Sequence, residues 1–137
     1  MLYAIPSNVV KSIVDNIIDY CFGTETERVQ RAMLGISVTT SDSKAVYDSS
    51  TGMISIKETV SVYEVSEGSI AQGILNEGDT FVSSTLNENV TEINRQYDII
   101  DMMLDVRAGD TVNFNIIRDG KNINVSITIT EDCLTEY

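Results

Sequence analysis

The sequence contains no histidine, which restricts the chemistry that its other residues could perform. A Ser-His-Asp or Cys-His mechanism needs an imidazole to move the proton. Zinc sites would also lose their commonest nitrogen ligand. Catalysis by a lysine or by a pair of carboxylates is compatible with the composition, but no spacing argues for either. We therefore expect no catalytic residue, no metal site and no cofactor in this chain.

The two cysteines could in principle perform redox chemistry or staple the fold. Cys21 and Cys133 lie near opposite ends of the chain and do not form a Cys-x-x-Cys pair. Two cysteines in a chain of this length are also fewer than a disulfide scaffold requires. We expect free or buried thiols, and a bridge that ties the two ends together is the alternative.

The charge balance restricts the partners. Nine Lys and Arg residues face 21 Asp and Glu residues, which gives a formal net charge of −12. A field of this sign repels phosphate backbones and anionic lipid, so we expect no nucleic-acid partner. An acidic surface also keeps a protein soluble.

Length and hydropathy predict one compact domain, with room for an appendage. The chain has 137 residues, of which 42% are apolar, enough for a buried core. No stretch approaches the roughly 20 apolar residues that span a bilayer. A basic, apolar signal segment is also missing, although the natural protein need not begin at Met1.

The N-terminal region predicts a short strand followed by an amphipathic helix. Leu2 to Ile5 has strand character and Pro6 ends it. A helix is expected to begin at Ser7 or Asn8 and to end between Tyr20 and Gly23. Its apolar residues lie on one face, which needs a surface to lie against. They are Val9, Val10, Ile13, Val14, Ile17 and Ile18.

A polar segment, 24–31, separates this helix from a region of strand-like periodicity. Leu34, Ile36 and Val38 alternate with small or polar residues, as in a half-buried strand. The segment 39–51 is polar, with a turn near 48–52. The remaining expected elements follow in order: strands at 53–56 and 60–65, a helical turn at 69–75, a strand at 80–84, a tight turn at 87–89, a helix from between 91 and 95 to about 106, and a hairpin of 111–118 and 121–130 across Asp119-Gly120.

Several blocks of this sequence, taken in order, resemble PDZ domains. They are Met33-Leu34-Gly35-Ile36, the run 68–74 followed by Glu77-Gly78-Asp79, the run 108–112, and the run 117–121. They are similar to the carboxylate-binding loop, the small helix with its exit, the return from the long helix, and the last hairpin of that family. The resemblance implies an α+β fold: a PDZ-like, partly open β-barrel or sandwich of short strands with one short and one longer helix, preceded by the N-terminal amphipathic helix.

The N-terminal block extends the likeness to bacterial proteases of the HtrA/Deg type. Tyr3-Ala4-Ile5-Pro6-Ser7-Asn8 and the helix after it resemble the last strand and helix of the trypsin-like HtrA protease domain. The resemblance implies four segments: a protease remnant at 1–23, a linker at 24–31, a PDZ domain at 32–132 and a tail at 133–137. The Gly-Asn-Ser-Gly-Gly nucleophile motif is absent, so the chain is not expected to be an enzyme, whereas its parent would be a serine endopeptidase.

The resemblance also implies a peptide-binding site. A ligand carboxylate would accept hydrogen bonds from the backbone N–H groups of Leu34, Gly35 and Ile36, since a glycine lets a ligand approach the backbone closely. The peptide would then add as a strand beside Ile36 to Val38. The groove is expected to be lined by Ser37, Val38, Tyr97, Ile100, Met103 and Leu104. Arg28 and Arg31 could attract the carboxylate, or they could be ordinary exposed residues of the linker.

Two functions follow from these expectations. The first is a module that binds apolar C-terminal peptides of unfolded or substrate proteins, beside its parent protease domain in an extracytoplasmic HtrA-like protease, with assembly into homo-oligomers through the parent. The second is a structural or oligomerisation domain whose groove does not function. This chain has Ser69 where the family frequently has a proline before the small helix. The segment 39–53 has no close match in the family. The rim of the site is therefore the part that the resemblance defines least.

Overall fold

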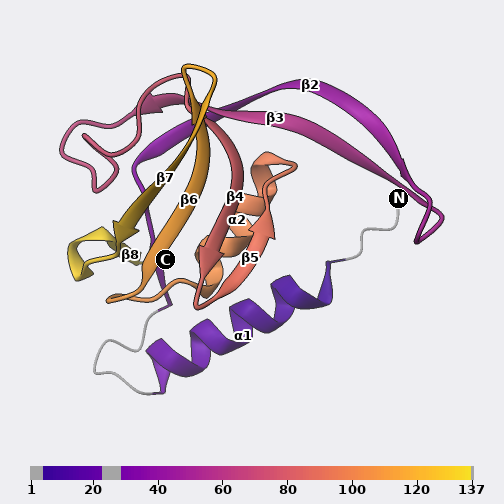
Figure 1. Ribbon diagram of the computed structural model, residues 1–137. Coiled ribbons are helices and arrows are strands. Elements are labelled where there is room, and N and C mark those ends of the chain that lie inside the picture. The colour runs from indigo at the N-terminus through magenta and orange to yellow at the C-terminus, as the bar shows by residue number, and fades with distance from the viewer. Residues whose placement is uncertain (1–4, 23–28, 137) are drawn as a thin grey trace.

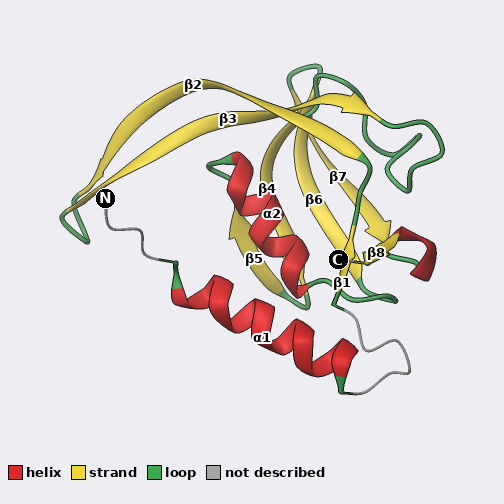
Figure 2. Cartoon of the chain, turned by 180° about the vertical axis from the view of Figure 1, so that it is seen from behind, coloured by secondary structure: helices red, strands yellow, loops and turns green. Residues whose placement is uncertain are grey.

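The computed structural model describes residues 5–22 and 29–136. Two helices, α1 (Ser7–Cys21) and α2 (Gln96–Asp105), lie beside one main antiparallel sheet (Figures 1 and 2). Its strands are β2 (Ile36–Asp48), β3 (Met53–Val65), β4 (Thr80–Leu86), β5 (Asn89–Glu92), β6 (Thr111–Arg118) and β7 (Lys121–Thr128). The order is β2-β3-β4-β6-β7, with β5 paired to β4. The expected α+β class is confirmed.

The core lies between the sheet, α2 and the turns that follow β3. Val60, Phe114 and Ile116 are completely buried. The rings of Phe81 and Phe114 pack edge to face with their centroids 5.3 Å apart, a favourable arrangement of aromatic quadrupoles. The alternation predicted for the last strand holds in part, since Ile127 is fully buried while alternate residues face solvent.

Two tight hairpins follow from the local sequence. Asp119 and Gly120, between β6 and β7, both have positive φ, 52° and 73°. This is the conformation that an Asp-Gly pair favours in a two-residue turn. Asn87 and Glu88 adopt similar angles between β4 and β5, 49° and 67°. Both turns were expected from the sequence.

The polar segment after Val38 is a strand and not an irregular loop. β2 and β3 each have 13 residues and pair along most of that length, from Ile36 with Val65 to Asp48 with Met53. Both strands extend beyond the body of the domain (Figure 1). We call residues 44–57 the hairpin arm. The sequence prediction missed it because the polar residues of an exposed two-stranded arm carry no alternation of buried and exposed positions.

The segment 69–75 forms consecutive turns and not a regular helix. The N–H of Gln72 donates to Ser69 O at 3.1 Å, and the N–H of Leu75 donates to Ala71 O at 3.0 Å. Glycines 68, 73 and 78 punctuate this segment with φ between 76° and 87°. A left-handed residue in its middle prevents the helix from continuing.

Strands also form where the linker and the tail were expected. β1 (Gln30–Ala32) pairs antiparallel with β8 (Leu134–Glu136), just after a 3-10 turn, η1 (Glu131–Cys133). The pairing continues as the N–H of Met33 donates to Cys133 O at 2.8 Å. The expected strand at 2–5 lies almost entirely outside the described residues. The domain limits themselves stay a prediction.

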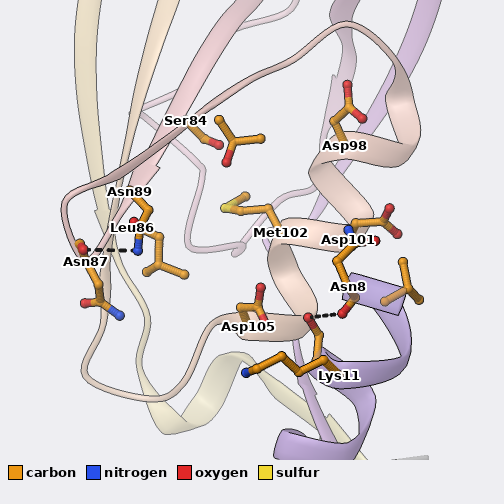
Figure 3. Close-up of a pocket in the computed structure, with 13 residues that line it drawn as sticks. Asn8, Lys11, Ser84, Leu86, Asn87, Asn89, Asp98, Asp101, Met102 and Asp105 are labelled. Carbon is orange, nitrogen blue, oxygen red and sulfur yellow. Dashed lines mark hydrogen bonds between the residues drawn. The ribbon is translucent and has the colours of Figure 1, made fainter. Parts of the chain in front are cut away.

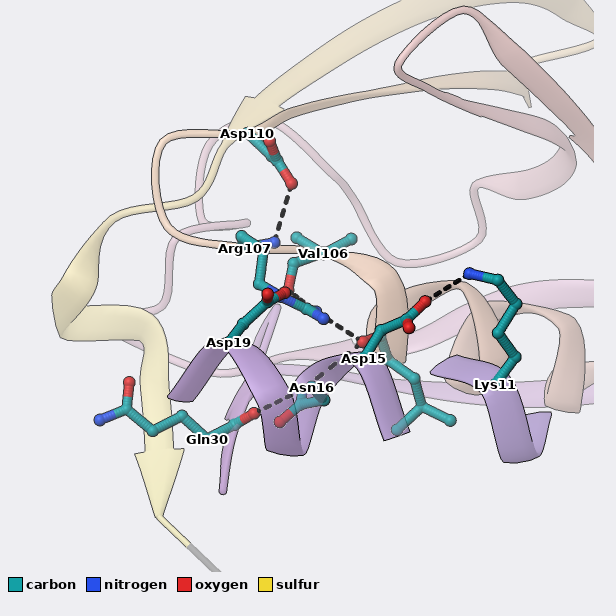
Figure 4. A network of polar contacts seen from close by, with 9 residues as sticks. Lys11, Asp15, Asn16, Asp19, Gln30, Val106, Arg107 and Asp110 are labelled. Carbon is teal, nitrogen blue, oxygen red and sulfur yellow. Dashed lines mark hydrogen bonds and ion pairs between the residues drawn. The ribbon is translucent and has the colours of Figure 1, made fainter. Parts of the chain in front are cut away.

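Helix α1 begins at Ser7 as expected, but its polar face contacts the rest of the chain. Ser12, Asn16 and Tyr20 are its buried residues. Asn16 Nδ2 donates to Gln30 O at 3.0 Å, and the guanidinium of Arg107 bonds Asp19 Oδ2 at 2.9 Å (Figure 4). The same guanidinium lies 5.5 Å from the ring centroid of Tyr20, a cation–π distance.

The apolar face of α1 is therefore left largely open. Val10, Val14 and Ile18 are 46%, 47% and 52% exposed. The sequence indicates that this face needs a partner surface, and the described residues do not provide one. A helix of this kind normally buries its apolar stripe.

Candidate functional site

The loop that joins β1 to β2 is built around Gly35. Its φ is 72°, a conformation that side chains disfavour, and a Cβ placed there would lie 2.3 Å from Ser69 Cβ. Glycine is thus required for two separate reasons. Its absence of a side chain lets the turns of 69–75 pack directly against the loop.

The peptide plane after Gly35 directs a hydrogen-bond donor outward. Gly35 O accepts from the N–H of Ser66, next to the end of β3, at 2.8 Å. All described peptide bonds are trans, and the N–H and C=O of a trans peptide point in opposite directions. The N–H of Ile36 therefore points away from β3. Within the described residues, the N–H groups of Leu34 and Gly35 donate to no other group.

An apolar pocket of about 200 Å³ lies beside these donors, between the loop, β2 and α2. We call it the groove. Six residues named from the sequence line it: Leu34, Gly35, Ile36, Val38, Ile100 and Met103. Leu34 and Met103 are buried core residues, whereas Ile100 is 41% exposed. The structure therefore brings most of the expected site residues together.

Three of the expected residues lie elsewhere. Ser37 is exposed and does not line the groove. Tyr97 is 57% exposed and also outside it. Leu104 lines a different pocket, together with Ile13 of α1 and β1. Leu104 lies about 100° around the helix from Met103, on the side of α2 that faces α1 and β1.

Other residues of the groove were not expected from the sequence. Gln96 and Ile99 come from α2 and Arg31 from β1. Gln96, Ile99, Ile100 and Met103 follow the i, i+3, i+4, i+7 spacing of one helix face. Ile99 lies four residues before Met103, so taking Met103 as the reference for that helix face would have predicted Ile99. Arg31 lies at the groove, while Arg28 falls outside the described residues.

The exposed side of β2 is a free sheet edge next to the groove. β2 is the first strand in the sheet order and pairs only with β3. An edge strand presents unpaired N–H and C=O groups that an extended peptide can use. The edge, the outward N–H of Ile36 and the apolar groove lie side by side.

An ion pair holds the turns behind the loop in place. Asp79 is 1% exposed, and its carboxylate accepts from Arg118 at 2.8 and 2.6 Å and from the N–H of Asn76 at 2.8 Å. Arg118 also donates to Ile74 O at 2.8 Å. Burial raises the pKa of Asp79, but the hydrogen bonds from Arg118 and Asn76 outweigh it, so the net effect is a pKa below the ordinary value.

No metal or disulfide chemistry is visible in the part of the chain that the structure describes. Residues 5–22 and 29–136 contain no group of three or more metal-ligating side chains. Cys21 and Cys133 are free thiols, so the alternative bridge is not formed. Among the same residues, no helix is long and apolar enough to cross a membrane.

Comparison with protein families gives one match, to the family described as "PDZ domain", over residues 32–129. The chain belongs to the PDZ family. The PDZ domain of this chain contains the loop, the groove and both tight hairpins. Comparison with curated proteins gives no match.

Solved structures of an HtrA-type protease and of a serine endoprotease share the fold over nearly the whole of this chain. The HtrA-type protease AlgW with a decapeptide matches with a TM-score of 0.55 and 21% identity, over 93% of this chain and 35% of that one. AlgW with a tripeptide matches with a TM-score of 0.56 and 22% identity, over 96% and 39%. The serine endoprotease from Yersinia pestis gives 0.55 and 24%, over 98% and 37%. The chain thus spans little more than a third of these proteins.

Proposed function

We propose that this PDZ domain binds peptides with a free, apolar C-terminus by adding them as a strand beside β2. The observation that carries the proposal is the outward N–H of Ile36, held next to an apolar groove and a free sheet edge. The similar structures of AlgW with a decapeptide and of AlgW with a tripeptide support it.

The loop would supply the carboxylate site. The N–H groups of Leu34, Gly35 and Ile36 would donate to the terminal carboxylate, and Gly35 leaves the approach clear. Hydrogen bonds to a charged acceptor are worth about 1.5–3 kcal/mol each, more than neutral ones. A blocked C-terminus would lose most of that contribution.

The groove would select the last side chain. Leu34, Ile100 and Met103 offer it an apolar surface, so we expect Val, Leu or similar residues at the ligand's C-terminus. Methionine changes shape easily, which favours tolerance over strict selection.

The parent protein would be a bacterial, extracytoplasmic serine endopeptidase of the HtrA type, in which this domain delivers substrates or regulates the protease. The exposed apolar face of α1 supports this, because a protease domain packed there would cover Val10, Val14 and Ile18. Assembly into oligomers would occur through the parent.

A structural or oligomerisation role is the second candidate, and the hairpin arm favours it. Cross-strand pairs put Ala45 with Ile56 and Tyr47 with Ile54 on one face. Tyr47, Ile54 and Ile56 are 65%, 70% and 43% exposed. Exposed apolar strands promote association between copies.

Fluorescence anisotropy with the 137-residue chain tests the proposal. A labelled decapeptide that ends in Val with a free carboxylate should bind saturably, and its amidated form should bind at least tenfold more weakly. The variant Ile100→Lys should weaken binding, whereas Tyr97→Lys, on the same helix but outside the groove, should not. Equal affinity for both peptides would refute the carboxylate site. Absent binding with self-association in sedimentation would favour the second candidate.

A further inference from the structure

A second pocket, of about 350 Å³, lies on the opposite side of α2 from the groove. It is an open pocket lined by residues of α1, of α2 and of the β4–β5 hairpin (Figure 3). No residue lines both this pocket and the groove. Its chemistry is also different, because carboxylates, amides and hydroxyls line most of it, with only a few apolar side chains such as Leu86 and Met102.

Three carboxylates of α2 face the pocket. Asp98, Asp101 and Asp105 follow an i, i+3, i+7 spacing that places them on one helix face. One Asp98 oxygen caps the helix, accepting from the N–H groups of Asn94 and Arg95 at 2.7 and 2.8 Å. Burial raises the pKa of Asp101, and the charges of Asp98 and Asp105 raise it further. The acids therefore repel one another at neutral pH.

The pocket's own residues do little to relieve this repulsion. Lys11 is the only cationic residue among those that line it. Its ammonium group is in an ion pair with Asp15, one turn further along α1, and interacts more weakly with the charge of Asp105. A pocket with three acids and one engaged lysine keeps a net negative field.

A buried hydroxyl points independently to a missing ligand. Ser84 is 1% exposed, and its Oγ has no hydrogen-bond partner within the described residues. It lines the pocket, and Figure 3 shows its side chain on the strand across from α2. Leaving a buried hydroxyl unpaired costs about 1–3 kcal/mol. A ligand that offers N–H donors would satisfy it.

We propose that this pocket binds an organic cation that carries ammonium or guanidinium groups. Such groups donate hydrogen bonds to carboxylates and hydroxyls and fill more space than a metal ion. The backbone rise puts Asp101 and Asp105 about 6 Å apart along α2, a separation that the two ends of a short diamine can match. The cation is either a free molecule or a Lys or Arg side chain of another chain.

Binding would also fix α1 against the PDZ domain. Asn8 and Ser12 of α1 line the same pocket as Asp101 of α2. A cation that contacts both sides stabilises the arrangement in which they face each other. Occupation should therefore raise the thermal stability of the chain and leave the groove unchanged.

Calorimetric titration of the 137-residue chain with 1,4-diaminobutane, at constant ionic strength, tests the proposal. Saturable binding is expected, tighter than that of butylamine. Asp101→Asn and Asp105→Asn should each weaken it about tenfold, and Ser84→Ala by a smaller factor. Glu67→Gln, which removes an exposed carboxylate away from the pocket, is the matched control and should bind like the original chain.

Sedimentation velocity separates the two sources of the cation. If the chain self-associates, and diaminobutane or Asp101→Asn abolishes this, the cation is a basic side chain of a second copy. If the chain is monomeric and binds diaminobutane, the pocket takes a free molecule. The proposal is overturned if the diamine shows only weak, non-saturating effects that are equal in Asp101→Asn and Glu67→Gln, with both variants folded by circular dichroism.

Discussion

At the scale of single residues, Gly35 connects backbone geometry to the candidate binding function. Its positive φ turns the chain from β1 into β2, and its missing side chain lets Ser69 approach. The same turn directs the N–H of Ile36 toward the free sheet edge. One residue thus sets both the packing behind the loop and the donor in front of it.

Gly35→Ala should weaken both stability and peptide binding. The left-handed conformation costs a non-glycine residue about 1–2 kcal/mol, and the Cβ also overlaps Ser69. The double variant Gly35→Ala with Ser69→Gly removes the overlap but keeps the backbone strain, so it should recover only part of the stability. Urea unfolding and peptide anisotropy measure the two effects. Unchanged affinity in Gly35→Ala would contradict the site.

Asp79 and Arg118 are the residue pair whose protonation should matter most for stability. The folded-state pKa of Asp79 is lowered, so its contribution is present above the unfolded pKa, about 4, and is lost as the pH falls through the folded value. Arg118→Ala leaves a buried carboxylate without its ion-pair partner and should cost about 3 kcal/mol at pH 7.

The pH dependence of stability distinguishes loss of the Asp79–Arg118 ion pair from a simple loss of packing in Arg118→Ala. Without Arg118, burial dominates and raises the pKa of Asp79, so protonation should favour the folded variant. The difference in unfolding free energy between Arg118→Ala and the original chain should therefore shrink between pH 7 and pH 3. Asp79→Asn in both backgrounds is the control, and a pH-independent difference would exclude the explanation.

At the scale of elements, the hairpin arm stands apart from the domain core. No residue between 39 and 59 belongs to the buried cluster, which β3 joins only from Val60 onward. The arm instead exposes an apolar face and two free edges. Lys44 lies directly opposite Lys57 on the neighbouring strand, and two like charges in this position repel each other. An ion pair between Lys57 Nζ and Glu92 Oε2, at 3.4 Å, partly offsets this repulsion.

Replacing residues 45–56 by Asn-Gly should leave the domain folded. The arm contributes no core burial, and Asn-Gly supplies the two-residue turn that joins Lys44 to Lys57. We expect a change of only a few degrees in Tm, which corresponds to about 1 kcal/mol or less, and unchanged peptide affinity. Differential scanning calorimetry and anisotropy measure both. Loss of cooperative unfolding would show that the arm is part of the folding unit.

At the scale of the whole molecule, α2 separates two regions of opposite character. Ile99, Ile100 and Met103 face the apolar groove, whereas Asp98 and Asp101 face the acidic pocket next to α1. α1 lies on the acidic side with its polar face inward, and its apolar face is turned to solvent.

Much of this fold could be predicted because local rules decided it. Asp119-Gly120 specifies a two-residue turn, and the alternation from Ile123 onward specifies a strand. The candidate site was predicted differently, through the resemblance of Met33-Leu34-Gly35-Ile36 to the carboxylate-binding loop of PDZ domains, and its role in binding stays a prediction. The groove residues of α2 were harder to predict, because most positions of this helix are apolar. Tyr97 and Leu104 were expected to line the groove but do not.

The sequence by itself determined the PDZ-type elements, their order and the glycine on which the loop depends, because these rest on backbone preferences and short-range periodicity. Only the tertiary structure decided that 39–51 is half of an arm, that β1 pairs with β8, and that α1 turns Asn16 inward instead of its apolar stripe. Each of these features depends on contacts between segments far apart in the chain. A local sequence pattern does not say which distant segment will pack against it.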